Sequence, residues 1–415
     1  MKKLLVLANE FPYGTWEPYM ETEEQYYSSF DKVWIASLQL RKDHAETKRK
    51  LKCGATVIPV SYRSRLFYLL NSITVLADGQ LYKEIAKLMR QGLFSPSRLV
   101  DLFVFLSRAH HEAMVIDKAL RNENKTDILL YSYRFEYQPY IAVLLKKKWK
   151  TQQYIVSRAH RYDLYEEQHG NNYIPLRTYI LNSIEYLYPC SMHGVEYVDD
   201  RYKDISAKVG CRYLGTVDHG ERVVKKDSTK IRLVSCSNVV KVKRLEKIVN
   251  ALSLIKDIDI EWTHYGDGPL MDTIRQLAEN KLGQNIAYCF LGNVANKQLL
   301  AEYARKDYDF FVNVSSSEGL PVSIMEAMSF GIPCIATDVG GTKEIVNDEN
   351  GFLLNVDVSD EEIAQVIRDF FYIDEHKYMQ LRDNARSYWN NKFNSDYNYT
   401  SYVDELIKLW QGCTQ

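Results

Sequence analysis

The sequence predicts an α/β protein of two doubly wound domains, each with a parallel sheet covered by helices on both faces. Two observations lead to this fold class. The chain has 415 residues, 46% hydrophobic and 26% charged, which is ordinary for a globular protein and too long for a single compact core. Short apolar runs rich in β-branched residues alternate with longer helical stretches, as in βαβ units.

About five strands are expected in each half of the chain. In the first half the runs cover residues 4–8, 32–36, 56–60, 127–131 and 154–157. In the second half they cover residues 231–236, 260–265, 286–291, 310–314 and 333–337. Strands in this number, with helices between them, suffice for one doubly wound domain in each half.

A domain boundary is expected in the polar stretch 213–229, which gives domains 1–212 and 213–395. Residues 1–212 hold 31 Lys and Arg and 24 Asp and Glu, while the rest hold 22 and 30. The formal charge of −1 therefore hides two halves of +7 and −8, and the near-zero total gives no reason to expect a nucleic-acid partner. Residues 396–415 have apolar side chains at helical spacing, so we expect a helix that packs on the first domain.

Sequence features favour a cytoplasmic location. The first apolar run ends at Asn9 after about five residues, short of the roughly 7–15 in a secretory signal, and no stretch approaches the ~18 apolar residues of a membrane span. The seven cysteines are scattered and never in CxxC spacing, which indicates reduced thiols and no structural zinc.

Residues 62–120 differ from the rest of the chain because basic and apolar side chains are mixed in a stretch expected to be helical. Such a helix either lies on an anionic membrane surface or covers the sheet, and the second arrangement is the commoner one. The mixed residues include Arg63, Arg65, Lys83, Lys87 and Arg90 with Phe67, Leu69, Leu70 and Phe94.

The most informative stretch joins the strand FFVNV, the polar turn SSSEGL and a helix expected to begin at Pro321 and end at Gly331, since proline suits the first helical position and glycine the position after the last. Free amides around Leu320, Val322 and Ser323 are expected to form an anion site there.

Glu318 and Glu326 flank that site. A carboxylate repels phosphate but accepts hydrogen bonds from hydroxyl groups. The pair therefore suits a ligand with phosphate in the middle and a polyol at each end, which is the layout of a nucleotide sugar. Two such glutamates are most often solvated surface acids, but the strand, turn and helix around them favour a site.

With its surroundings, SEGLPxxxxEAxxxGxPxIATDxGG, this stretch resembles the region of retaining GT-B glycosyltransferases of the GT4-type (group 1) family in which two glutamates stand seven residues apart. The GDGP turn at Gly266, the strand end Phe290-Leu291-Gly292 and Glu344 extend the resemblance. It implies the GT-B fold, two Rossmann-like domains facing each other across a cleft, with the acceptor bound by the first domain and the nucleotide sugar by the second.

The resemblance also implies roles for individual residues. Glu318 would bind hydroxyls of the transferred sugar and Glu326 those of the ribose. The turn would wrap the sugar and its amides would face the diphosphate, through Gly319, Leu320, Pro321, Val322 and Ser323.

The family usually has an arginine and a lysine five residues apart after the first strand of this domain, and here Asn238 stands at the arginine position. Lys243 matches the lysine and is expected to offset negative charge on the leaving diphosphate. Arg244 or Lys241 would replace the arginine, or Asn238 would donate a neutral hydrogen bond. Alternatively, these cations are a solvated helix start.

In the first half, His160 resembles the family's active-site histidine, although a lone histidine is as often structural. Gly14 lies in residues 9–24, which correspond to a loop near the acceptor and diphosphate. The tyrosine-rich residues 131–140 either present aromatic faces to a sugar acceptor or are packed inside the domain.

The implied function is transfer of a hexosyl unit from a nucleotide diphosphate sugar to an acceptor hydroxyl with retention of configuration, in bacterial surface glycan or glycolipid synthesis. The implied route is front-face substitution, in which the leaving diphosphate takes the acceptor proton, and no cofactor or metal is expected. The expected partners are the donor, a glycan or lipid-linked acceptor and an anionic membrane contacted peripherally on its inner face.

Three alternatives are weighed against this function. A dehydrogenase needs GxGxxG at its first turn, and neither ANEFPYGTW nor CSNVVKVKR provides it. A nucleotide-sugar 2-epimerase is disfavoured by the EGLP turn and the spacing of the glutamates. A non-catalytic, transferase-like binding partner stays open because of Asn238. The shared motif does not encode the sugar, base or acceptor.

Overall fold

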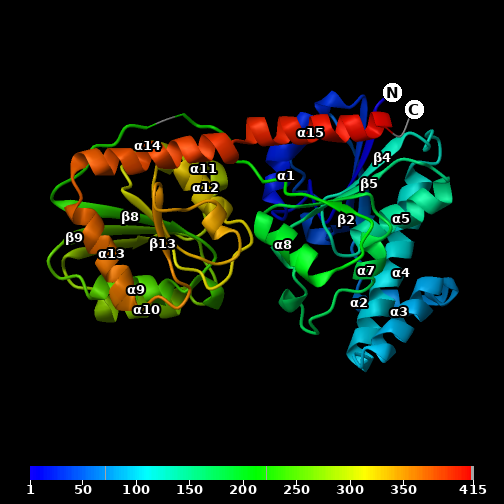
Figure 1. Cartoon of the computed structure of the whole chain (residues 1–415), viewed down its shortest axis with the longest axis horizontal. Coiled ribbons are helices and arrows are strands. Elements are labelled where there is room, and N and C mark those ends of the chain that lie inside the picture. The colour runs from blue at the N-terminus through cyan, green and yellow to red at the C-terminus, as the bar shows by residue number, and fades with distance from the viewer. Residues whose placement is uncertain (71, 221, 413–415) are drawn as a thin grey trace. The chain divides into compact units, whose positions relative to one another are not determined.

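A computed structural model describes residues 1–70, 72–220 and 222–412. Asn71, Glu221 and Cys413, which fall within stretches considered above, lie outside this range. The chain divides into two units, one of Met1–Arg212 with Tyr399–Gln415 and one of Tyr213–Asn398. The division falls at the polar stretch after Arg212 and within the last helix (Figure 1).

Unit 1 is built on a seven-stranded sheet in the order β3-β2-β1-β4-β5-β6-β7. Every pair is parallel. The strands are β1 Lys3–Ala8, β2 Lys32–Leu40, β3 Thr56–Ser61, β4 Ile128–Ser132, β5 Ile155–Ala159, β6 Tyr186–Pro189 and β7 Lys208–Val209.

Helices and 3-10 segments connect these strands. They are α1 Pro18–Glu23, η1 Glu24–Ser29, η2 Lys42–His44, α2 Arg65–Leu70, η3 Ser72–Ala77, α3 Gly79–Arg90, α4 Pro96–Ala119, α5 Gln138–Trp149, α6 Arg161–Leu164, η4 Glu166–Gln168, α7 Arg177–Leu181 and α8 Met192–Arg201.

Both faces of this sheet are covered, which explains why β1 is apolar from Leu4 to Ala8. Leu5 and Leu7 pack with residues of α4 and α5 on one face. Leu4 and Val6 pack on the other face with α1, η1 and the last helix, α15 Ser395–Gly412. From Tyr399 onward α15 belongs to unit 1.

Unit 2 is built on a six-stranded parallel sheet in the order β10-β9-β8-β11-β12-β13. Its strands are β8 Lys230–Cys236, β9 Asp259–Tyr265, β10 Ile286–Phe290, β11 Phe310–Asn313, β12 Cys334–Thr337 and β13 Gly351–Leu354. The connections are η5 Lys241–Lys243, α9 Leu245–Ser253, α10 Met271–Lys281, α11 Asn296–Arg305, α12 Val322–Met328, η6 Thr342–Glu344, α13 Asp360–Tyr372 and α14 Glu375–Lys392.

The α/β prediction is confirmed, with corrections to the strand count. The sheets have seven and six strands instead of about five each, because β6, β7 and β13 are short and were not predicted. The sequence YLYP of β6 ends in proline, and β7 has only two residues. These segments carry too few alternating side chains for a periodicity to stand out.

Candidate functional site

The loop after β8 brings one predicted cation against one predicted acid. Lys243, at the end of η5, places its Nζ 2.6 Å from Oε1 of Glu318, and the two side chains are 23% and 10% exposed. Asn313 donates to the same oxygen at 3.3 Å. An ammonium group has three N–H donors, so the bond to Glu318 leaves two of them for a ligand. Asn238 and Lys241, on the same loop, are exposed.

Arg244 is turned toward the protein backbone. Its conformation is left-handed, with φ of 50°. Its Nε donates to Val314 O at 2.6 Å, and its two terminal nitrogens donate to Val356 O at 2.7 Å and Ser315 O at 3.1 Å. The guanidinium therefore fixes the chain after β11, and of the two substitutes predicted for the missing arginine, Lys241 is the one with an exposed ammonium.

The EGLP turn is held by close backbone contacts. The amide of Gly341 donates to Gly319 O at 2.7 Å. Gly340 has φ of +56°, and a Cβ there would lie 2.1 Å from Glu318 O, so only glycine fits this position. Leu320 is buried in the turn.

The helix after this turn starts one residue later than the sequence predicts. Pro321 is the N-cap, with ψ of 98°, and α12 begins at Val322. An extended ψ cannot continue a helix, so the prediction of proline at the first helical position is wrong. Val322 is buried and Ser323 partly buried. The helix ends at Met328, and Gly331 follows with φ of +68°.

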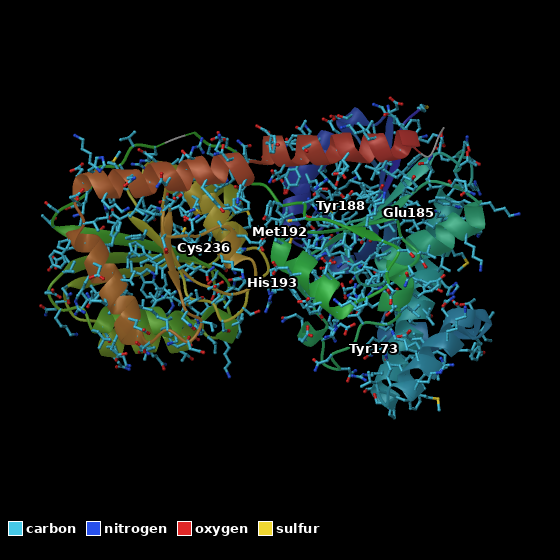
Figure 2. The ribbon with its side chains drawn as sticks, viewed as in Figure 1. Tyr173, Glu185, Tyr188, Met192, His193 and Cys236 are labelled. Atoms are coloured by element: carbon cyan, nitrogen blue, oxygen red, sulfur yellow. The ribbon has the colours of Figure 1, made fainter. Side chains whose placement is uncertain are left out.

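Glu326 is a partly buried side chain on α12. Burial raises the pKa of its carboxyl to about 7, opposed by a hydrogen bond from Asn296. Asn296 Nδ2 donates to Oε1 at 2.7 Å. Cys236, at the end of β8 (Figure 2), is close enough that burial and then the Glu326 charge raise the pKa of its thiol to about 12. A carboxyl that loses its proton near neutral pH becomes a pure acceptor for paired hydroxyls.

Gly266 allows the GDGP turn to touch the loop after β8. Its φ is +128°, and a Cβ there would lie 1.9 Å from Ser237 O. Its amide donates to Gly292 O at 2.8 Å, and Val239 donates to Asp267 O at 3.0 Å. The close approach fixes the position of the loop that carries Asn238 and Lys243.

In unit 1, the loop after β1 is organised around a carboxylate. Glu17 accepts hydrogen bonds from the amides of Asn9, Glu10 and Phe11 at 3.0–3.1 Å. Gly14 in this loop has φ of +59°, and a Cβ there would lie 2.7 Å from His44 Nδ1. Any side chain at position 14 would therefore displace the neighbouring His44 side chain.

His160 follows β5 and caps α6. Its amide donates to Asp163 Oδ1 at 2.6 Å, and its Nδ1 lies 3.4 Å from Oδ2. Burial lowers the pKa of His160, which favours the neutral ring, although Asp163 opposes the shift. The buried Nε2 has no hydrogen-bond partner among the described residues.

Glu136, on the turn after β4, is a candidate that our reading of the sequence missed. Burial, and then the negative charge of Asp163, raise the pKa of its carboxyl to about 7. The signal was an acid just beyond a strand end, where doubly wound sheets bind ligands. The tyrosines around it do not present aromatic faces to solvent, because Tyr131, Tyr133, Tyr137 and Tyr140 are buried.

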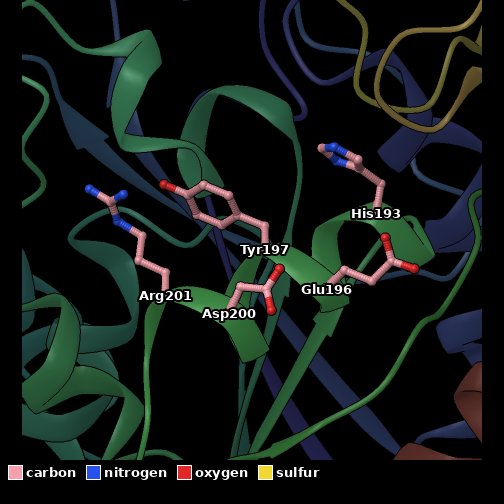
Figure 3. A pocket seen from close by; sticks show the side chains of 5 residues that line it. All are labelled: His193, Glu196, Tyr197, Asp200 and Arg201. Carbon is pink, nitrogen blue, oxygen red and sulfur yellow. The ribbon is translucent and has the colours of Figure 1, made fainter.

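A cavity of about 410 Å³ lies along α8 (Figure 3). It is lined by one face of the helix: His193, Glu196, Tyr197, Asp200 and Arg201. Arg201 is already paired with Glu166.

Neither a metal cluster nor a spanning helix is found in the described parts of the chain. No group of three His, Cys, Asp or Glu side chains within residues 1–70, 72–220 and 222–412 is arranged to hold a metal ion. Within the same ranges, no helix has both the length and the apolar character needed to cross a bilayer.

Residues 219–388 match the family described as glycosyl transferases group 1. A curated relative, N-acetyl-alpha-D-glucosaminyl L-malate synthase of Bacillus anthracis, is 32% identical over 176 residues, which cover 41% of this chain and 43% of the relative. UDP-Gal:alpha-D-GlcNAc-diphosphoundecaprenol alpha-1,3-galactosyltransferase of Escherichia coli is 28% identical over 150 residues, 35% of each chain. These matches span less than half the length of the relatives.

Solved structures match almost the whole chain. HepE of Anabaena in complex with UDP and glucose aligns with a TM-score of 0.66 at 15% identity, covering 98% of this chain and 100% of that one. Sucrose-phosphate synthase from Thermosynechococcus elongatus aligns with a TM-score of 0.72 at 13% identity, covering 99% and 100%. The two Rossmann-like units therefore have the GT-B fold.

Proposed function

Because residues 219–388 match the glycosyl transferases group 1 family, we propose that this chain is a retaining hexosyltransferase that uses a nucleotide diphosphate sugar. The observation that carries the proposal is the Lys243–Glu318 pair at 2.6 Å beside the EGLP turn. The pair sets a cation next to a carboxylate that accepts hydrogen bonds from hydroxyl groups, as the junction between a diphosphate and a sugar requires.

Each predicted residue then has a distinct task. Glu318 accepts hydrogen bonds from the hexose, and the free N–H donors of Lys243 face the diphosphate. Glu326 accepts from the ribose hydroxyls in its ionised form. UDP in the HepE structures and the UDP-Gal donor named for the Escherichia coli relative support a nucleotide sugar as donor.

The proposed reaction needs no enzyme nucleophile. The bond between the anomeric carbon and the diphosphate oxygen breaks, the acceptor oxygen attacks from the same face, and its proton passes to the departing diphosphate. The protein contributes alignment and a fixed positive charge near the leaving group. Because Lys243 supplies this charge, we propose that no divalent metal is required.

We further propose that the acceptor is a glycan or lipid-linked hydroxyl compound of bacterial surface glycan synthesis. The names of the relatives support this class, since one includes a diphosphoundecaprenol acceptor. In unit 1, the partly buried side chains of His160 and Glu136 are the groups that we assign to the acceptor.

The test is release of nucleoside diphosphate from a panel of nucleotide sugars, with and without candidate acceptors. Glu318→Gln should lose most of the release, whereas Glu361→Gln, a matched change at an exposed glutamate, should not. Absence of both binding and release across the panel refutes the transferase. Binding without release in the wild type identifies a non-catalytic binding partner, and conversion of the donor without acceptor identifies an epimerase.

Two finer points need their own measurements. The anomeric configuration of the product, read by NMR, tests retention. Turnover measured after exhaustive treatment with a chelator tests independence from metal.

A further inference from the structure

Unit 1 exposes a concentrated group of large apolar side chains that we call the apolar surface. Within the described residues, eight exposed side chains of this kind fall between positions 66 and 94. Leu70 and Ile73 are 76% and 81% exposed. The members are Leu66, Leu70, Ile73, Leu76, Tyr82, Met89, Leu93 and Phe94. Scattered apolar residues are normal on a protein surface, but these come from α2, η3, α3 and the residues just after α3, and α2 and α3 each contact η3. Such a gathering indicates a contact site.

The elements that carry this surface are anchored on their other side. Tyr68 of α2, Val75 of η3 and Leu81 and Leu88 of α3 are buried. Figure 1 shows α2 and α3 gathered near one end of α4. The hydroxyl of Tyr82 donates to the backbone oxygen of Leu76 at 2.8 Å, which joins α3 to η3. The outward apolar side chains are therefore displayed by packed elements.

The exposed charges among these elements are positive. Residues 62–94 contain five Lys and Arg and two Asp and Glu. Arg63, Lys83 and Arg90 are exposed, and Lys83 and Arg90 make no hydrogen bond or ion pair within the described chain.

Both acids of this segment are satisfied by inward partners. Asp78 accepts from His110 at 2.7 Å and from Tyr140 at 2.5 Å. Glu84 is buried and accepts at 3.2 Å from the hydroxyl of Tyr173, labelled in Figure 2. The surface therefore offers apolar side chains with unneutralised cations among them.

We propose that the apolar surface docks on an anionic lipid bilayer. Apolar side chains would enter the headgroup boundary while the long cationic side chains reach the lipid phosphates. A second copy of the chain fits less well, because a two-fold contact would bring the same cations toward each other. The inference extends the proposed function, since a lipid-linked acceptor would be held at such a surface.

The experiment is co-sedimentation of the full chain with vesicles of phosphatidylcholine alone and of an equimolar mixture with phosphatidylglycerol. We expect binding to the mixed vesicles that weakens with salt. Lys83→Glu/Arg90→Glu should weaken it by at least about fivefold for each cation removed, from about 1 kcal/mol per cation near an anionic surface. Leu70→Ser/Ile73→Ser/Met89→Ser should weaken it further.

Matched controls and opposing outcomes make the test decisive. Tyr372→Ser/Tyr397→Ser removes equally exposed aromatic side chains from unit 2, and Lys256→Glu/Lys408→Glu reverses exposed cations elsewhere. Both should bind as the wild type does. Equal binding to the two vesicle types, no binding, or wild-type binding by the apolar variant overturns the inference. The inference is also overturned if the wild-type chain self-associates in sedimentation equilibrium but binds no vesicles, and the apolar variant no longer self-associates.

The vesicle assay requires neither donor nor turnover, so the two proposals fail separately. A chain that releases nucleoside diphosphate but ignores vesicles refutes the docking surface alone. A chain that binds mixed vesicles but neither binds nor releases nucleotide refutes the transferase alone.

Discussion

Lys243→Met is the change that most directly challenges the proposed site. Methionine keeps the apolar length of the side chain and removes the ammonium, which lies 2.6 Å from Glu318 Oε1. The diphosphate then leaves without the nearby cation, and Glu318 loses its ion-pair partner while keeping the weaker bond from Asn313. We expect a loss of turnover that exceeds any loss of stability.

The size of the effect follows from the partial burial of the pair. Two unit charges 4 Å apart attract by about 4 kcal/mol at an effective dielectric constant of about 20. Removing one preorganised charge partner from a developing anion costs about 2.7–4 kcal/mol, or roughly 100- to 1,000-fold in kcat. Because Lys243 is 23% exposed, solvent weakens its field, so we expect the lower end, about 100-fold. Loss of the bond to Glu318 should cost about 1 kcal/mol of unfolding free energy.

The assay is the initial rate of nucleoside diphosphate release at saturating donor, with thermal unfolding measured on the same protein. Lys256→Met is the matched control, because it removes an exposed lysine of unit 2 from the segment after α9. We expect it to change kcat by less than about threefold, since exposed charges contribute little. Lys243→Arg should keep part of the activity, because the positive charge stays while its shape changes.

Equal losses in Lys243→Met and Lys256→Met would refute the reasoning, since the effect would then come from general charge and not from the placed ammonium. Full activity in Lys243→Met would refute it as well. A fall in activity that matches a large fall in melting temperature would show a structural role instead.

Three further predictions concern the pH response of Glu326 and the packing inside each unit. Burial raises the pKa of Glu326 from its usual 4.5 to about 7, so its contribution to the free energy of unfolding should fall as pH rises across that interval. Because the ionised carboxylate is the form that accepts from the ribose, the affinity for nucleoside diphosphate, measured by calorimetry, should rise through pH 7. Glu326→Gln should abolish this pH dependence. Gly266→Ala should lower stability by more than about 2 kcal/mol, since the new Cβ would meet a backbone oxygen at 1.9 Å; Gly170→Ala, with nothing within 4 Å, should melt as the wild type does. Arg158→Met should cost about 3–5 kcal/mol in denaturant unfolding, because the buried Glu23 loses its partner at 2.5 Å, and replacing Glu23 as well should recover part of that loss.

The fold class was predictable because its signal is repeated many times. Strands such as β1 and β4 are buried on both faces, and residues 4–8 and 128–130 therefore read as continuous apolar runs. β13 gives no such signal, because its four residues GFLL are too few to show a pattern, are only partly buried after the first and follow the polar residues NDEN. Short edge strands are defined by the neighbour they pair with, which local sequence does not encode.

For the candidate site, the sequence predicted only the placement of residues on elements. A strand, a turn and a helix in succession place Glu318 on the turn and Glu326 on the helix, as the structure has them. The direction of Arg244 was not predictable, because it depends on a left-handed backbone and on three carbonyl groups from distant segments. Glu136 was missed for a similar reason, since its shifted pKa comes from burial and from Asp163, 27 positions further along the chain.

The second half of the chain is negatively charged overall, yet its proposed ligand is an anion. The positions of individual charged groups explain how such a ligand could bind. Residues 213–415 carry 30 Asp and Glu against 22 Lys and Arg, but salt screens exposed charges beyond about 10 Å, so groups in contact with the ligand decide binding. Arg244 is committed to backbone oxygens, and Glu326, whose pKa burial raises to about 7, is assigned to the ribose hydroxyls and not to the diphosphate. The partly buried ammonium of Lys243 therefore carries most of the local attraction for a diphosphate, so its removal, more than any change in net charge, should weaken both donor binding and turnover.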